Sequence, residues 1–178
     1  GELTTCEFVL SLHKAAGGTV PLLAVKIKYS NVPLGNSPEE RPVVAGRILA
    51  DLGGHFYVEC GTFCVAAALT GGVLKIKGLD PKIIKTELDL LKKTGSRIKT
   101  NKNQILINGP KKIKNIKILA TKEWPGFSTD LQAQFMVLLC KANGRSIIIE
   151  NIFQNRFMHV NELKRLGATI VVKNNKAI

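Results

Sequence analysis

A spacing of 72 residues relates two parts of this chain, and it limits the folds open to it. Apolar residues and glycines recur at that spacing: Phe63, Gly72, Ile76, Leu91 and Gly95 return as Phe135, Gly144, Ile148, Leu163 and Gly167. Glycines often end helices, and apolar residues at fixed intervals mark core positions. The repeat predicts two copies of one βαβαββ-like unit, the second cut off about where its final strands should form.

Hydrophobic periodicity and breakers predict an α/β (α+β) protein. We expect helices at 62–69, from Asp80-Pro81 to Gly95, at 128–142 and at 156–166. We expect strands at 22–29, 73–77, 97–100, 104–107, 113–119 and 146–150, with a last pair from Thr169. Residues 1–56 are irregular and rich in breakers, so we assign 57–178 to one partial domain and leave 1–56 unassigned.

The net charge of +13 is unevenly distributed. Residues 1–60 hold five Lys and Arg against six Asp and Glu, whereas residues 61–178 hold twenty-one against seven. Such a field attracts nucleotides, phosphate esters or nucleic acids, although a solvated lysine-rich surface has the same composition. No apolar run approaches the roughly eighteen residues of a membrane span, and no signal-peptide pattern is present. We therefore expect a cytoplasmic protein without a membrane partner.

The four cysteines predict no metal centre. Cys6, Cys60, Cys64 and Cys140 form no CxxC pair, and a structural zinc site needs four ligands. Cys64 and Cys140 lie among apolar residues, which favours buried, reduced thiols.

The segment 128–168 holds the candidate functional residues. Asp130 opens one expected helix, and Asn155, Arg156 and His159 open the next. Charged groups at element ends often form sites in α/β proteins. The alternatives are that Asp130 only stabilises the first turn of its helix and that Arg156 is an ordinary surface residue. For His159 we favour a structural role.

Three motifs resemble those of one family. They are Glu59-Cys-Gly-Thr-Phe63, Pro125-Gly-Phe-Ser-Thr-Asp-Leu-Gln-Ala-Gln-Phe135 and Asn155-Arg-Phe-Met-His-Val-Asn-Glu-Leu-Lys-Arg-Leu-Gly-Ala168. Together they resemble the UDP-N-acetylglucosamine enolpyruvyl transferases (1-carboxyvinyltransferases) of peptidoglycan synthesis. The resemblance implies an inside-out α/β barrel in each of two domains, each built from three βαβαββ units around buried helices. This chain would supply about one and a half units.

The resemblance also implies a reaction and its residues. Family members transfer enolpyruvate from phosphoenolpyruvate to a hydroxyl of UDP-N-acetylglucosamine and release phosphate, without a cofactor. Asp130 corresponds to the aspartate proposed as general base, which contacts the sugar hydroxyl. Thr129 and Ile152 correspond to positions near the nucleotide sugar, and Arg156 to an arginine of the cleft.

The chain also departs from the family pattern. The reactive cysteine of the family lies in the other domain, and nothing here matches its loop. Tyr57 stands where the family has an arginine, Ser128 where it has proline, and Gln154 where it has glutamate. We therefore expect a fragment that needs the missing half of the fold and is inactive alone. The alternatives are a basic, non-enzymatic module that binds nucleic acid or nucleotides, and an inactive relic.

Overall fold

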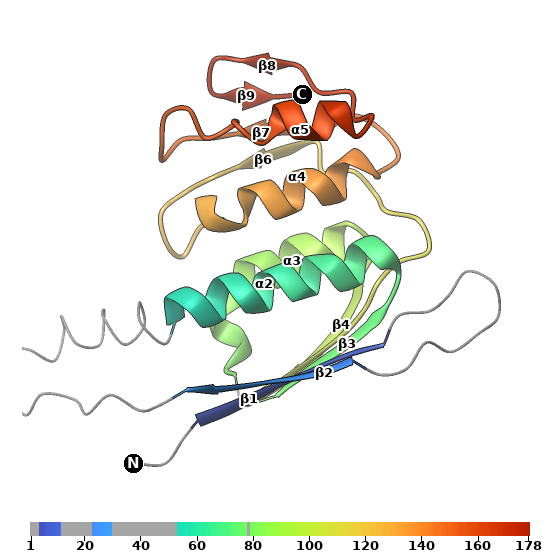
Figure 1. The fold of residues 1–178 in the computed structure, drawn as a ribbon, viewed down its shortest axis with the longest axis vertical. Helices are drawn as coiled ribbons and strands as arrows, with labels where there is room; N and C mark the ends of the chain where they lie inside the picture. The colour runs from blue at the N-terminus through green and yellow to red at the C-terminus, as the bar shows by residue number, and fades with distance from the viewer. Residues whose placement is uncertain (1–3, 12–22, 30–52, 78) are drawn as a thin grey trace, which may run out of the picture.

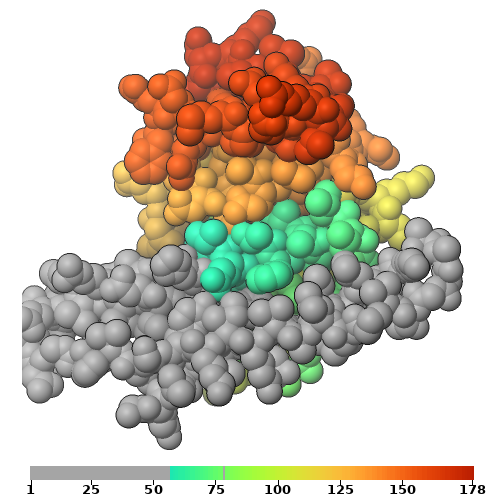
Figure 2. All heavy atoms as spheres, viewed as in Figure 1, coloured from blue at the N-terminus to red at the C-terminus, as the bar shows by residue number. Residues whose placement is uncertain are grey.

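In the part of the chain that the structure describes, three helices lie between two β-sheets. The structure, a computed structural model, describes residues 4–11, 23–29, 53–77 and 79–178. Helices α2 (Gly53–Thr70), α3 (Lys85–Lys93) and α4 (Gln132–Cys140) form the middle of the molecule, with one sheet below and the other above them (Figure 1). The C-terminal part of the chain, coloured orange and red, gathers at one end of the long axis (Figure 2).

The first sheet is antiparallel and has the order β2-β1-β3-β5-β4. Its strands are β1 (Thr4–Ser11), β2 (Leu23–Tyr29), β3 (Val73–Lys77), β4 (Arg97–Asn101) and β5 (Gln104–Asn108). Alternate residues of the central strands are buried, as in Leu74 and Ile76, which is the pattern of a sheet with one face against the core. The strand expected at 22–29 is confirmed, but β1 was not predicted.

Local signals set the ends of the helical segment that η1 (Pro81–Ile84) and α3 form together. Asp80 caps the short 3-10 helix η1, because its carboxylate accepts a hydrogen bond from the Lys82 backbone N–H at 3.0 Å. Gly95 has φ +104° just after the helix, a conformation that glycine adopts without strain. The expected start and stop of this helical segment are confirmed. In contrast, α2 begins at Gly53, nine residues before the expected start.

The second sheet has the order β6-β7-β9-β8. Its strands β6 (Ile118–Ala120) and β7 (Ile147–Ile149) are parallel, whereas β8 (Val172–Lys173) and β9 (Lys176–Ala177) add antiparallel pairs. The strand expected at 113–119 is wrong for residues 113–117. There the backbone N–H of Lys114 donates to the carbonyl of Thr94, and Lys114 forms only an isolated bridge to Asn143.

The last helices are shorter than expected. Residues 128–142 divide into a 3-10 turn, η2 (Thr129–Leu131), followed by α4. The helix expected at 156–166 is confined to α5 (Val160–Arg165). Turns occupy residues 154–159 instead. Asn155, at φ +56°, lies in the left-handed region within them.

The core lies where α2 and α4 meet. Phe127 and Phe135 pack edge to face with ring centroids 4.9 Å apart, and Leu131 beside them is fully buried. Across the interface the Gln134 amide donates to the Thr62 hydroxyl at 3.1 Å. The middle of the molecule therefore joins both sheets to one packed core.

Buried thiols were predicted for Cys64 and Cys140. The prediction is correct for Cys64 and wrong for Cys140. Cys64 is a buried thiol in α2, as is Cys60, whereas Cys140 is exposed at the end of α4. Among the described residues, no helix combines the length and apolar character that a membrane crossing requires.

Candidate functional site

Two segments meet at the candidate site: the η2 turn and the loop that follows β7. The turn begins at Ser128, whose hydroxyl accepts a hydrogen bond from the Asp130 backbone N–H at 3.1 Å. Ser128 is thus the cap of this turn. The Asp130 side chain is therefore available for contacts outside the turn.

The Asp130 carboxylate pairs with Arg156. Arg156 Nη2 lies 3.0 Å from Asp130 Oδ1, and Arg156 Nε donates to the Thr129 hydroxyl at 3.5 Å. The guanidinium carbon also lies 5.4 Å from the centroid of the Phe153 ring, within cation–π range. About half of each charged side chain is exposed. The structure thus brings three of the four predicted site residues into one cluster.

Glu150 lies beneath this cluster and is almost completely buried, at 3% exposure. Its Oε1 accepts from the Thr121 hydroxyl and from the backbone N–H groups of Ile152 and Phe153, and its Oε2 accepts from the Thr129 hydroxyl. Burial acts to raise the pKa of Glu150, but these hydrogen bonds together outweigh it and hold the pKa below its ordinary value. Glu150 is therefore a charged anchor shared by both segments of the site.

A second buried carboxylate supports the turn from the other side. Glu87, at 1% exposure, accepts hydrogen bonds from the Tyr57 hydroxyl and from the Ser128 backbone N–H. Burial, and then the hydrogen bond with Glu87, raise the pKa of the Tyr57 phenol far above its ordinary value. Tyr57 thus remains a neutral donor. Through Glu87, this residue fastens α2 to α3 and to the turn that carries Asp130.

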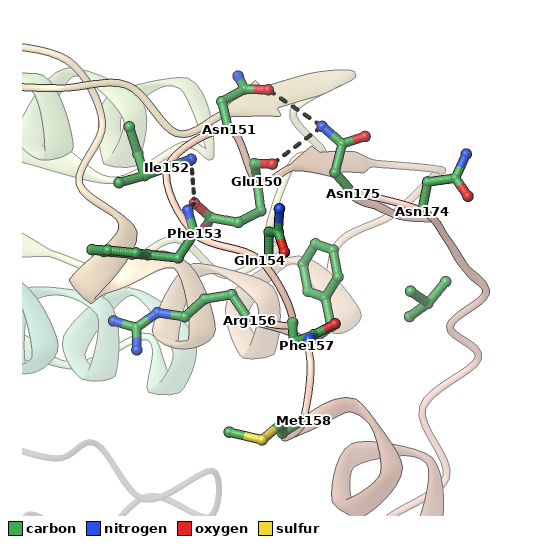
Figure 3. A pocket seen from close by; sticks show the side chains of 12 residues that line it. Glu150, Asn151, Ile152, Phe153, Gln154, Arg156, Phe157, Met158, Asn174 and Asn175 are labelled. Atoms are coloured by element: carbon green, nitrogen blue, oxygen red, sulfur yellow. Dashed lines mark hydrogen bonds between the residues drawn. The ribbon is translucent and has the colours of Figure 1, made fainter.

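A pocket of about 940 Å³ opens beside the loop after β7 (Figure 3). Its lining includes Ile152 and Arg156, together with Asn174 and Asn175. The Asn175 side-chain amide donates to the Glu150 carbonyl at 3.1 Å. This hydrogen bond holds the part of the pocket wall that contains Asn175. Thr129 and Asp130 are not part of this lining, and Arg156 extends from the pocket toward them. Ile152 is half-buried in the wall.

In the ranges that the structure describes, no three His, Cys, Asp or Glu side chains form a group that could hold a metal ion. The chemistry available to the site is that of one aspartate, one arginine, hydroxyl groups and backbone amides. An arginine and an aspartate can form charge-assisted hydrogen bonds with phosphate and hydroxyl groups.

Sequence reasoning identified Asp130, Thr129, Ile152 and Arg156 but missed Glu150, Glu87 and the support from Tyr57. One signal for Glu150 was available, because a lone acidic residue directly follows the apolar run Ile147–Ile149. A charge placed at the end of a buried strand indicates either a site or a paired internal group. Glu87 lies within a helix among charged neighbours and offers no comparable signal.

Residues 39–178 match the family model described as EPSP synthase (3-phosphoshikimate 1-carboxyvinyltransferase). The chain belongs to the EPSP synthase family. This match includes the site and most of the described structure, and it begins upstream of the boundary that we drew at residue 57.

Two curated relatives of this EPSP synthase-family chain carry the same name. The chain is 64% identical over 120 residues to the UDP-N-acetylglucosamine 1-carboxyvinyltransferase of Pelagibacter ubique, covering 67% of this chain and 28% of that protein. It is 50% identical over 121 residues to the protein of the same name from Desulfosudis oleivorans, covering 68% and 29%. The resemblance drawn from the three sequence motifs is thereby confirmed. The chain spans less than a third of the length of these relatives.

One solved structure supports the fold of this EPSP synthase-family chain. The enolpyruvyl transferase NikO from Streptomyces tendae matches with a TM-score of 0.61 at 23% identity, over 67% of this chain and 28% of that one. At that identity the likeness concerns the fold alone, which is a mixed arrangement of helices and strands as expected.

Proposed function

We propose that this chain forms part of the nucleotide-sugar site of a peptidoglycan-precursor enolpyruvyl transferase. The observation that carries the proposal is the Thr129–Asp130–Arg156 cluster, which the turn at 129–131 and the loop after β7 assemble. The ligand would be UDP-N-acetylglucosamine, which offers both hydroxyl and phosphate groups to such a cluster. Ile152, in the wall of the neighbouring pocket, would contact the same ligand.

In the proposed reaction each residue has a definite role. The Asp130 carboxylate accepts the proton of the sugar hydroxyl as that oxygen attacks phosphoenolpyruvate, and phosphate leaves as the enolpyruvyl ether forms. Arg156 holds Asp130 in place by their ion pair and presents its remaining N–H groups to anionic oxygens. We propose that phosphoenolpyruvate is bound mainly by parts of the relatives that this chain does not span, so that this chain binds the sugar nucleotide without turnover.

The architecture supports a corresponding proposal for the fold. The elements α2, β3, α3, β4 and β5 are followed about 72 residues later by α4, β7, α5, β8 and β9 in the same order. Gly95 and Gly167 both have positive φ, at +104° and +95°. We infer two copies of one unit, with helices inward and sheets outward, as in an inside-out barrel. The first strands of the two proposed units differ in direction: β1 is antiparallel to β3, whereas β6 is parallel to β7. We also propose a cytoplasmic location, which suits the buried thiols Cys60 and Cys64.

Titration with UDP-N-acetylglucosamine, followed by ¹H–¹⁵N correlation spectra of the labelled chain, tests the functional proposal. We expect the amide resonances of Thr129, Asp130, Ile152 and Arg156 to move with a saturable dependence on ligand concentration. The matched variant Asp130→Asn keeps the shape of the side chain and should weaken binding, because it removes the negative partner of Arg156. An absence of saturable shifts at these amides would contradict the proposal.

A further inference from the structure

The four hydrogen bonds to Glu150 determine which way its neighbouring hydroxyl groups point. An ionised carboxylate has only acceptor atoms, and hydrogen bonds hold the pKa of Glu150 below its ordinary value. The Thr121 and Thr129 hydroxyls, each 2.9 Å from a carboxylate oxygen, must therefore both donate their protons to Glu150. Each threonine has a single hydroxyl proton, so its oxygen can only accept hydrogen bonds from other groups.

The contacts of Thr121 fit this polarity. Its oxygen accepts a hydrogen bond from the Asn151 backbone N–H at 2.8 Å, and the groups available to its proton are acceptors, Glu150 Oε1 at 2.9 Å and the Ile149 carbonyl at 3.4 Å. Thr129 has the same arrangement, with its proton toward Glu150 and its oxygen toward Arg156 Nε at 3.5 Å. The Thr129 oxygen therefore presents lone pairs, and no proton, to the side of the turn where Asp130 and Arg156 lie.

Glu150 also fixes the distance between the two segments. Its backbone contacts to Ile152 and Phe153 hold the start of the loop that leads to Arg156, and its contact to Thr129 holds the turn that carries Asp130. The ion pair between Asp130 and Arg156 is half exposed, and ion pairs of that kind contribute little to structure on their own. A buried anchor that contacts both segments is better suited to maintain their alignment.

We propose that Glu150 is a positioning residue of this site, which acts through Thr129 to orient Arg156 and to keep the Thr129 hydroxyl an acceptor toward the ligand. The site would accordingly select a donor group, such as a hydroxyl or amide N–H of the ligand, at Thr129. This inference rests on the proposed function only for the nature of the ligand. Its structural part concerns the chain alone.

The first test needs no ligand. It follows the Arg156 Nε–H resonance and its exchange with water in Glu150→Gln and Thr129→Val. Glutamine keeps the shape of glutamate but carries an amide that donates to one of the hydroxyls. We expect both variants to move the resonance and to raise its exchange rate about tenfold, the loss expected for a charge-assisted contact. Thr129→Ser should restore the wild-type signal.

Two control variants distinguish a role of Glu150 in orienting Arg156 from a role in the stability of the fold alone. Thr121→Val removes the other hydroxyl from the same carboxylate, and Thr94→Val removes a buried hydroxyl that donates to the Leu91 carbonyl at the end of α3. Both should lower the thermal midpoint and leave the Arg156 signal unchanged. If Glu150→Gln and Thr129→Val likewise lower the midpoint but leave the Arg156 signal at its wild-type position, the proposal is overturned.

A titration with UDP-N-acetylglucosamine then separates this inference from the proposed function. If the wild-type chain binds and Glu150→Gln binds about tenfold more weakly, the titration supports both. If the wild-type chain does not bind while the Arg156 signal responds as expected, the proposed function fails and the positioning role stands. Equal binding by wild type and Glu150→Gln would overturn the role of Glu150 toward the ligand.

Discussion

Ser128 and Thr129 are consecutive residues, and each is bonded to a different buried carboxylate. The Ser128 backbone N–H donates to Glu87, and the Thr129 hydroxyl donates to Glu150. The two acids approach the turn from different elements, α3 and the end of β7. The turn that presents Asp130 is therefore held on both sides by hydrogen bonds to buried acidic side chains.

Removal of the Tyr57 hydroxyl should destabilise the fold. Tyr57→Phe leaves the buried Glu87 carboxylate without one of its donors, and we expect a loss of about 1.5–3 kcal/mol in the free energy of unfolding. Urea denaturation measures this loss. Thr70→Ala is the control, because its hydroxyl donates to the Ala66 carbonyl at an exposed position and its loss should change stability by less than about 0.5 kcal/mol. Equal effects of the two changes would contradict the role given to Tyr57.

Glu150 should make stability depend on acid pH. Its pKa is lower in the folded chain than the ordinary glutamate value of about 4.3, so the unfolded chain takes up a proton first as the pH falls. The stabilisation is complete above the ordinary value and is lost as the pH falls through the lower, folded value. We expect the stability difference between wild type and Glu150→Gln to shrink on acidification from pH 7, as measured by urea midpoints.

Asp89 provides the comparison for this pH dependence. Hydrogen bonds from Lys85 and Lys92 lower the pKa of its exposed carboxyl, and salt screens such surface pairs. Asp89→Asn should therefore change the acid dependence less than Glu150→Gln, and less still at high salt. A larger effect from Asp89 would show that buried Glu150 is not the dominant titrating group.

At the scale of elements, the approach of α2 to η2 and α4 depends on one glycine. A Cβ atom at Gly61 would lie 2.3 Å from Leu131 Cδ1, and Leu131 is fully buried, so neither side can move freely. Gly61→Ala gains about 1 kcal/mol in helix propensity but overpacks the interface by about 1–3 kcal/mol. We expect a net loss of stability in thermal or urea unfolding.

A double-mutant cycle can assign that loss to the contact. In a Leu131→Ala background the space for a new Cβ is open, and Gly61→Ala should then stabilise the protein by up to about 1 kcal/mol through helix propensity alone. The sign of the effect thus reverses between the two backgrounds. The same sign in both would place the origin of the effect elsewhere than at Leu131.

The sequence predicted elements best where the signals are local. Asp80-Pro81 and Gly95 mark the ends of the α3 segment through capping and backbone conformation, which neighbouring residues determine. The segment 113–117 was overpredicted because Ile113 and Ile116 are apolar and buried, yet the chain there crosses between layers. Burial alone does not distinguish a strand from a packed connection.

The sequence identified the site residues one by one but did not predict which of them pair in space. Asp130 and Arg156 lie 26 residues apart, and their pairing depends on how η2 and the loop after β7 are placed by the fold. The contact between Tyr57 and Glu87 spans 30 residues. Long-range hydrogen bonds of this kind leave no periodic trace in a sequence.

At the scale of the whole molecule, stability should be greatest in the middle layer. Helix α4 contains the fully buried Phe135 and Leu138, whereas β8 is exposed along its length and pairs with β9 over two residues. Local opening requires less free energy where few apolar contacts must be broken. The β8–β9 hairpin should therefore open far more often than α4.

Native-state hydrogen exchange measures this difference. We expect the backbone amides of Phe135 and Leu138 to be protected at least about a hundredfold more strongly than those of the β8–β9 hairpin. Amides of α2 near Cys64 should match α4, because the two helices share a core. Uniform protection from α2 to the hairpin would instead indicate that the chain opens only as a single unit.

The hydrogen bond between Thr62 and Gln134 joins positions that are 72 residues apart, the same spacing that relates the two proposed units. A position can touch its own counterpart only near the axis of rotation that relates the two copies. A substitution there alters the surroundings of both copies at once, and a larger side chain on one side needs a smaller one on the other. On the proposed repeat, changes at residues 62 and 134 should accordingly be coupled.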